Sequence, residues 1–254
     1  MRPTPAPTGP FPTPTRAEGA PDRPPAHGLL RHRVEDGVSL PYLLWAPGPG
    51  WRMISSGPHG GGLGERHWFL NAQVPSGYSR TDPEAHLAEI AAHAGLTGPG
   101  AGLMTAAEVA AHGRHTDEGV TAVVTAGVGV HGWAAAPTPP EPPEHPVGTV
   151  NILVVLPVPL APAAFVGAVV TATEAKTQAL LDVGVPGSGT PTDAVCVAAP
   201  AAGCAGGPAT EPFAGPRSRW GARLARAVYA ATREACRRDP WVRDTAPDRA
   251  RPGA

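Results

Sequence analysis

The chain has 254 residues and carries 20 basic and 21 acidic side chains, which give a formal net charge of −1 at pH 7. This balance argues against nucleic acid or an anionic membrane surface as the principal partner. Apolar residues make up 42% of the sequence and charged residues 16%, so the chain can bury a sizeable core. The length suits one domain or two small ones.

The two ends of the chain differ in composition from its middle. Residues 1–28 are rich in Pro and Thr and lack the apolar core of a secretion signal, so we expect a disordered tail and a cytoplasmic protein. An ordered domain is expected over residues 29–240, followed by a second disordered tail over residues 241–254. The three cysteines form no close-spaced pair, which is typical of a reducing compartment.

Three short stretches in the first half of the chain have the composition of β-strands. They are Leu40–Ala46, Trp51–Ser56 and Trp68–Val74. A glycine-rich turn over residues 57–64 follows the second stretch and leads into the third.

Two helices are predicted after these strands. Asp82 is placed to cap a helix over Pro83–Ala94, because Pro stands at its first position and Gly95 follows its end. Thr105 and Glu108 have the spacing of a capping box, which predicts a shorter helix over Ala106–His112.

The second half of the chain alternates strands with longer helices. The predicted strands are Gly119–Val128, Thr149–Leu156 and Thr192–Ala198, and the predicted helices are Pro162–Val183 and Pro216–Arg238. Residues 137–146 are mostly proline and are expected to form an exposed loop. Strands outnumber helices and several are joined by loops. The predicted fold class is therefore α+β, with layered mixed or antiparallel sheets flanked by helices in a single domain.

One apolar run, Ile152–Val170, is long enough on paper to span a membrane. Pro157, Pro159 and Pro162 interrupt it, and three prolines would break a spanning helix in its middle. We expect a buried strand, a connection and a helix instead, with no insertion into a membrane.

Lys176 is the only lysine among the 20 basic residues. On a helical projection it falls inside the apolar arc of the Pro162–Val183 helix, and Glu174 lies at the edge of that arc. The residues predicted to form the arc are Phe165, Val166, Val169, Val170, Thr173, Leu180 and Leu181. Arginine cannot replace a compact ammonium group or a group that must lose its proton, so Lys176 is a candidate catalytic residue. The alternative is a salt-bridged or snorkelling lysine.

A second candidate lies where Ser55 and Ser56 run into the glycine turn. Successive backbone N–H groups in such a turn can bind an anion or an oxyanion, which makes Gly60, Gly61 and Gly62 candidate binding residues. Either serine hydroxyl could serve as nucleophile. An ordinary hairpin is the alternative.

Residues 187–193 form another hydroxyl-rich turn, in which we expect Thr190 and Thr192 to bind substrate. Asp193 at its end could act as a general base, as a partner of the lysine, or only as a turn-capping carboxylate. No Gly-x-Ser-x-Gly sequence is present, which argues against an α/β-hydrolase.

Three side-chain amides stand on apolar strands, where a buried amide needs hydrogen-bonding partners. Asn71, Gln73 and Asn151 could bind a substrate that itself carries amides, or could tie strands to loops. The histidines do not suggest a metal site, because His112 and His115 lack a carboxylate at ligand spacing. The arginines of the Pro216–Arg238 helix are expected to form a solvated face.

In order and spacing, several of these stretches resemble the adenosylcobinamide amidohydrolase (CbiZ) family over residues 45–200. The matching stretches are residues 53–56 (MISS), 60–64 (GGGLG), 71–74 (NAQV), 77–78 (GY), 102–107 (GLMTAA), 148–152 (GTVNI), 173–176 (TEAK) and 189–195 (GTPTDAV). Residues 129–133 (GVHGW) depart from the pattern expected after the glycine.

This resemblance implies hydrolysis of the amide that joins aminopropanol to the corrin ring of adenosylcobinamide. The product would be adenosylcobyric acid, used in cobamide salvage. The substrate brings its own cobalt-corrin, so no further cofactor is expected.

For this reaction we expect Ser55 or Ser56 at the carbonyl, with Lys176 handling protons and oriented by Glu174 or Asp193. A water molecule activated by either carboxylate is the alternative. The corrin would meet the three amides and the indole of Trp133 or Trp68. Two other functions stay open: a non-catalytic corrinoid-binding module, and an amidohydrolase acting on a different amide.

Overall fold

The computed structural model describes residues 29–137, 148–203 and 209–245. The predicted tail over residues 1–28 lies outside the described residues. The same holds for residues 246–254 of the second predicted tail and for nearly all of the predicted proline-rich loop.

The described strands form two sheets. The four-stranded sheet has the order β1-β2-β5-β6, and the six-stranded sheet has the order β4-β3-β10-β9-β8-β7. The strands are β1 (Leu29–Glu35), β2 (Val38–Trp45), β3 (Trp51–Ser55), β4 (Gly62–Glu65), β5 (Trp68–Gln73), β6 (Gly100–Thr105), β7 (Gly113–Asp117), β8 (Val120–Gly127), β9 (Thr149–Val155) and β10 (Ala194–Pro200).

Two helical crossovers explain the only parallel pairs within the described sheets. Helix α1 (Pro83–His93) joins β5 to β6, and helix α2 (Pro162–Asp182) joins β9 to β10. Both joined pairs are parallel, whereas the other neighbours are antiparallel. A parallel pair needs such a long connection, while an antiparallel pair can use a short turn. Helices α3 (Arg219–Arg238) and α4 (Pro240–Thr245) follow β10.

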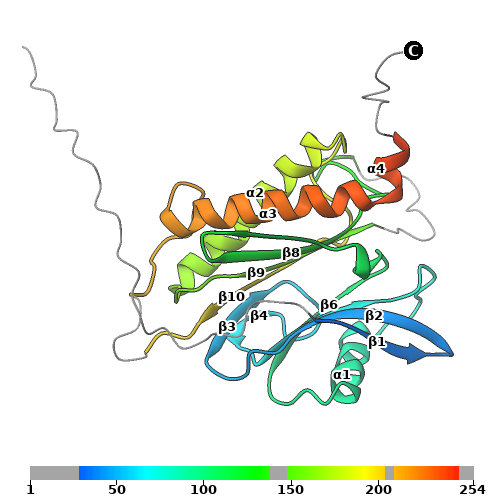
Figure 1. The fold of residues 1–254 in the computed structure, drawn as a ribbon, viewed down its shortest axis with the longest axis horizontal. Helices are drawn as coiled ribbons and strands as arrows, with labels where there is room; N and C mark the ends of the chain where they lie inside the picture. The colour runs from blue at the N-terminus through cyan, green and yellow to red at the C-terminus, as the bar shows by residue number, and fades with distance from the viewer. Residues whose placement is uncertain (1–28, 138–147, 204–208, 246–254) are drawn as a thin grey trace, which may run out of the picture.

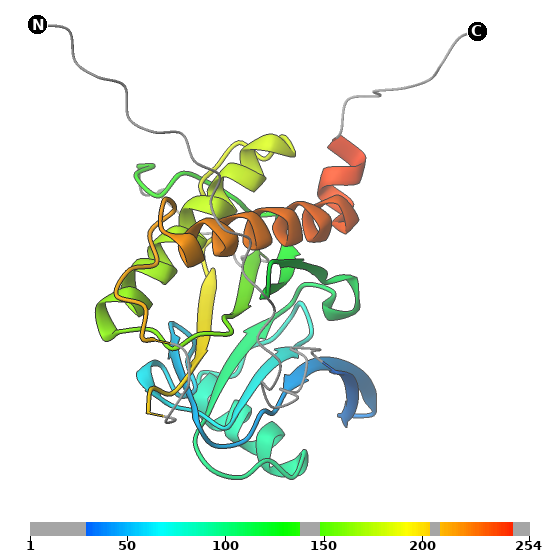
Figure 2. The same cartoon turned by 60° about the vertical axis from the view of Figure 1, so that its left-hand side comes forward.

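The elements stack in four layers, with helices outside and the two sheets face to face between them (Figure 1). The alternation of side chains between the two faces of β9 explains this stacking. Ile152 and Val154 belong to the core beneath α2 and α3, whereas Leu153 and Val155 belong to the core between the sheets. A third core lies between the four-stranded sheet and α1. The view turned by 60° shows the same order (Figure 2).

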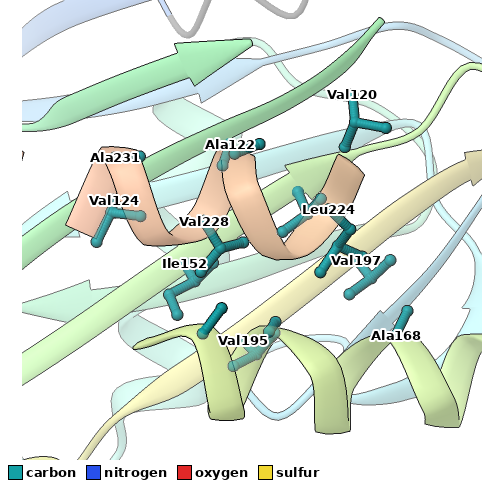
Figure 3. Packing of buried hydrophobic residues seen from close by; sticks show 14 of the residues in the cluster. Val120, Ala122, Val124, Ile152, Ala168, Val195, Val197, Leu224, Val228 and Ala231 are labelled. Carbon is teal, nitrogen blue, oxygen red and sulfur yellow. The ribbon is translucent and has the colours of Figure 1, made fainter. Parts of the chain in front are cut away.

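Helices α2 and α3 cover the outer face of the six-stranded sheet. Figure 3 shows Leu224 and Val228 of α3 above Ile152 of β9 and Val197 of β10, with Ala168 of α2 beside them. Small side chains let the helices approach one another and the sheet closely. Gly113 in β7 illustrates this, because a Cβ there would lie 2.0 Å from the carbonyl oxygen of Ala231 in α3.

The predicted fold class is confirmed, with two mixed sheets flanked by helices. Nine predicted elements are found with shifts of a few residues at their ends, and the apolar run after residue 151 divides into β9, a connection and α2. No helix in the described parts of the chain has the length and apolar character needed to cross a membrane.

Four strands and helix α4 were not predicted. The strands are β1, β4, β6 and β7. They are polar, short or glycine-rich, so their sequences lack the alternation that marks a half-buried strand. Helix α4 continues the ordered chain to Thr245, and its Val242 is buried.

The helix predicted over Ala106–His112 is wrong. Only a 3-10 turn over Val109–Ala111 is present, and β7 begins at Gly113. The capping box does not form, because the Thr105 hydroxyl instead accepts a hydrogen bond from the Ala107 N–H, at 3.0 Å. Such local side-chain bonds compete with a helix.

The predicted apolar arc of α2 is partly wrong. Val166, Val170 and Leu181 are exposed, and Thr173 is exposed as well. The buried face is made mostly of alanines, together with Phe165, Lys176 and Leu180. The prediction weighted large apolar residues, whereas close packing under α3 selects small ones.

Candidate active site

Lys176 is buried, with 6% of its surface exposed, and its ammonium group is ion-paired with the carboxylate of Asp193. Helix α2 supplies the lysine, and the turn that enters β10 supplies the aspartate. Glycine is required beside the pair, since a Cβ on Gly189 would lie 2.6 Å from Lys176 Nζ and 2.4 Å from Asp193 Oδ2. The hydroxyl-rich turn therefore brings its backbone directly against the ion pair.

Asp193 is held by four donors. Its Oδ1 accepts from the Val150 N–H at 2.9 Å and from the Thr190 hydroxyl, and its Oδ2 accepts from Lys176 and from the Thr190 N–H at 3.2 Å. A carboxylate has about four lone-pair positions, so these bonds use its acceptor capacity. The arrangement suits a group that orients Lys176, rather than one that takes a proton from water.

Two adjoining cavities meet at Asp193, which lines both. The Lys176 cavity has a volume of about 520 Å³. Its lining includes His131, Gly132, Trp133, Ala134, Thr173, Lys176, Thr177, Ser188, Gly189, Thr190, Pro191 and Asp193. Trp133 lies at this cavity with 54% of its surface exposed, so its indole can meet a large apolar ligand.

The Asn151 cavity has a volume of about 460 Å³. Its lining includes Ser56, Pro58, Val74, Pro75, Ser76, Tyr78, Pro83, Met104, Thr105, Ala106, Thr149, Asn151, Thr192, Asp193 and Ala194. Hydroxyl groups dominate the polar part of this lining. The cavity therefore fits a small polar group with donors and acceptors of its own.

Asn151 and Asn71 form a buried network between the two sheets. Asn151 Nδ2 donates to Asn71 Oδ1 and to the Met104 carbonyl, each at 2.9 Å, and Asn71 Nδ2 donates to the Thr125 hydroxyl at 3.0 Å. The Met104 carbonyl can only accept, which fixes the orientation of the Asn151 amide. Asn151 Oδ1 is buried and has no partner among the described residues. Asn151 lines the cavity, and its Oδ1 is a buried acceptor in need of a donor.

Most of the serine–glycine turn lies outside the two cavities. Ser55 is 6% exposed, and its hydroxyl oxygen accepts from the Gly57 N–H at 3.0 Å. The Gly60 carbonyl accepts from Arg66 Nε at 3.1 Å, and Arg66 also bonds the Gly61 carbonyl at 3.3 Å. Neither Ser55 nor the Gly60–Gly62 run is among the residues that line the two cavities. The glycines instead allow a close approach, because a Cβ on Gly60 would lie 1.9 Å from the Gly100 carbonyl oxygen.

Ser56 does reach the Asn151 cavity. Its hydroxyl oxygen accepts from the Val195 N–H at 3.0 Å, which ties the end of β3 to β10. Thr192 lines the same cavity, and its hydroxyl donates to the Gly148 carbonyl at 3.0 Å. Both hydroxyls are thus held in fixed positions.

Two predicted residues lie away from this site. Glu174 is exposed on α2 and lines neither cavity. Gln73 Oε1 accepts from the Val109 N–H at 2.9 Å, so this amide ties β5 to the 3-10 turn, which is the alternative role considered for it.

Sequence reasoning did not identify several lining hydroxyls. Ser188 and Thr177 line the Lys176 cavity, and Tyr78 and Thr149 line the Asn151 cavity. Ser188 shares the turn of Thr190 and could have been found there. Tyr78 lies in a loop whose residues carry no helix or strand pattern, and the stretch at residues 77–78 that resembles the family was the signal that could have identified it.

Other charged groups of the described residues serve packing. Arg226 forms two bonds of 2.7 Å with Asp117, and Arg223 is paired with Glu118. The arginine face of α3 is thereby attached to the β7–β8 hairpin. No group of three or more potential metal ligands gathers within the described ranges.

Comparison with known proteins gives one family match. A search of curated proteins finds no match to this sequence. The model of the family described as adenosylcobinamide amidohydrolase, CbiZ, matches residues 28–243, which include both cavities and most of the described chain. The chain therefore belongs to the adenosylcobinamide amidohydrolase family.

Proposed function

We propose that this protein hydrolyses the amide between aminopropanol and the corrin ring of adenosylcobinamide, releasing adenosylcobyric acid. Family membership supports the substrate class. The observation that carries the proposal is the buried Lys176–Asp193 pair at the junction of two cavities. One cavity has an exposed indole at its edge, and the other has a lining rich in hydroxyls.

The two cavities match the two parts of the substrate. The aminopropanol arm is small and carries a hydroxyl and the N–H of the scissile amide, which suits the Asn151 cavity. Asn151 lines this cavity and would meet the arm there. The corrin would lie over the Lys176 cavity against Trp133. Thr190 lines this cavity and Thr192 lines the Asn151 cavity, so both threonines lie near the point where the two cavities meet.

Lys176 would act on the carbonyl oxygen of the scissile amide. An ammonium group has three N–H donors, and one of them is bonded to Asp193. A second donor, aimed by that bond, can stabilise the negative charge that develops on the carbonyl oxygen. Asp193 would act through Lys176 as a positioning residue.

A water molecule would be the nucleophile. Ser55 is committed to the Gly57 N–H and is buried outside the cavities. Ser56 lines the Asn151 cavity, but its bonded neighbour in the described residues is a backbone N–H, which cannot act as a base. Ser56 would then bind the water or the amide, without forming an acyl-enzyme.

Mass spectrometry of the products tests this proposal. The protein is incubated with adenosylcobinamide, with and without a chelator, and the masses of adenosylcobyric acid and aminopropanol are expected in both samples. Tight binding of intact adenosylcobinamide without these products would mean a corrinoid-binding module. Neither binding nor turnover would mean that the site acts on another amide.

A further inference from the structure

A buried histidine outside the Lys176–Asp193 pair connects the Asn151 cavity to an acidic group behind it. His86 of α1 is 3% exposed. Its Nδ1 is 3.0 Å from the Tyr78 hydroxyl, and its Nε2 is paired with the carboxylate of Glu35 on β1. The Tyr78 ring also stacks on the His86 ring, with centroids 5.5 Å apart and an interplanar angle of 13°.

The carboxylate of Glu35 at one end determines which atom donates in each of these hydrogen bonds. An ionised carboxylate only accepts, so His86 Nε2 carries a hydrogen that it donates to Glu35. In the neutral imidazole, Nδ1 is then an acceptor, and the Tyr78 hydroxyl donates to it. The phenol oxygen keeps its lone pairs for a further donor. Tyr78 lines the Asn151 cavity, and together with His86 it lines a neighbouring cavity.

Hydrolysis of an amide needs a base that takes a proton from the attacking water and an acid that protonates the leaving nitrogen, and one group can serve in both roles. Lys176 and Asp193 are engaged with one another, and Ser56 has no base bonded to it in the described residues. Tyr78 lines the Asn151 cavity, and its hydroxyl is hydrogen-bonded to the imidazole of His86. It can therefore both accept the proton and return it.

We infer that Tyr78 is a catalytic residue of the proposed hydrolysis, and that His86 and Glu35 act through it as a proton relay. In the first step, the water oxygen bonds to the carbonyl carbon, and the carbonyl electron pair moves to its oxygen, held by Lys176. One water proton passes to the Tyr78 oxygen while the Tyr78 proton passes to His86 Nδ1. The resulting imidazolium is stabilised by Glu35.

In the second step, the oxyanion electron pair re-forms the carbonyl and the C–N bond breaks, leaving its pair on nitrogen. That nitrogen takes the Tyr78 proton, and His86 returns its proton to Tyr78. The OH of the water molecule thus ends in the acid, and a proton ends on the amine. Tyr78 and His86 return to the protonation states in which they started.

The surrounding charges agree with this role. Arg80, Asp82, Glu35 and Glu89 all influence Tyr78, and burial is the largest cause that raises the pKa of its hydroxyl above 10.0. Tyr78 is therefore an O–H group at neutral pH, as the relay requires. His86 itself faces Glu35 and Arg33 from β1, Arg80 and Asp82 from the preceding loop, and Glu89 and His93 from α1.

The experiment compares Tyr78→Phe and His86→Gln with two matched controls. Tyr229→Phe removes a half-buried tyrosine hydroxyl on α3, and His115→Gln removes an exposed histidine on β7; neither residue lines the Asn151 cavity or the cavities beside His86. The kcat and KM of aminopropanol release from adenosylcobinamide are measured, together with the melting temperature. Tyr78→Phe keeps the ring stack, so it serves even if His86→Gln fails to fold.

For Tyr78→Phe and His86→Gln we expect kcat to fall by about 10²-fold or more, with KM little changed, whereas both controls keep the wild-type rate. Wild-type kcat values in both variants would overturn the relay while leaving the proposed hydrolysis intact. The inference rests on that hydrolysis, so a wild-type protein that releases no aminopropanol would overturn both.

Discussion

Asn151 shows how one buried side chain can serve both stability and binding. Its Nδ2 donates to two acceptors, its Oδ1 is buried without a partner among the described residues, and the residue lines the Asn151 cavity. The same geometry makes the amide hard to replace. Its carboxylate counterpart would place negative charge beside the Asn71 and Met104 oxygens.

Asn151→Asp is therefore expected to lower the free energy of unfolding by about 1–3 kcal/mol at pH 7, measured by urea denaturation. Burial raises the pKa of the introduced carboxyl in the folded state, so the loss should shrink as pH falls toward 4 and the acid regains a donor. Gln178→Glu makes the same chemical change on the exposed face of α2 and should have little effect. Equal losses for the two variants would contradict the network.

Cys196 and Cys236 are buried thiols. Burial raises the pKa of each to about 12. In a Cys204→Ser background, we expect neither thiol to react with iodoacetamide at pH 8 in the native protein, and both to react in urea. Mass spectrometry counts the labels, and rapid labelling of the native protein would show that the inner core is open to solvent.

At the scale of elements, α2 packs through alanines. Ala172 is fully buried, whereas Val170 on the same helix is exposed. Ala172→Leu should lower the free energy of unfolding by about 1–3 kcal/mol, because the added carbons meet a closely packed surface. Val170→Leu, measured in the same urea titration, should change stability by less than about 0.5 kcal/mol. A tolerated Ala172→Leu would mean that the helix is loosely packed.

Helix α2 also shows which features of the sequence were informative. The position of Lys176 inside the buried face is confirmed, because helical periodicity is a local property of the sequence. The rest of the predicted face failed where alanine replaced larger apolar groups, since which side packs closely depends on α3, far along the chain. The capping box at Thr105 failed for the same kind of reason. The chain continues there as β7, whose partner β8 could not be read from those residues.

At the scale of the whole molecule, the four layers bring distant segments to one end of the sheets. The end of β3, the end of β6, the start of β9 and the turn before β10 together line the Asn151 cavity. The sequence suggested Asn151, Ser56 and Asp193 one at a time. Their meeting, and the exclusion of Ser55 and Glu174, depend on strand order and on the direction of each side chain along its strand. No single stretch of sequence contains that information.

The most direct test of the account compares Lys176→Arg with the wild-type protein in the release of aminopropanol from adenosylcobinamide. The variant keeps a positive charge but replaces a compact ammonium with a planar group, in a space bounded by Gly189 and Asp193. The exposed Arg237→Lys exchange on α3 controls for the chemistry of the swap. We expect kcat to fall by about 10²-fold or more for Lys176→Arg, and the control to match the wild-type protein. A Lys176→Arg protein that turns over at the wild-type rate would contradict the central role given to the Lys176–Asp193 pair.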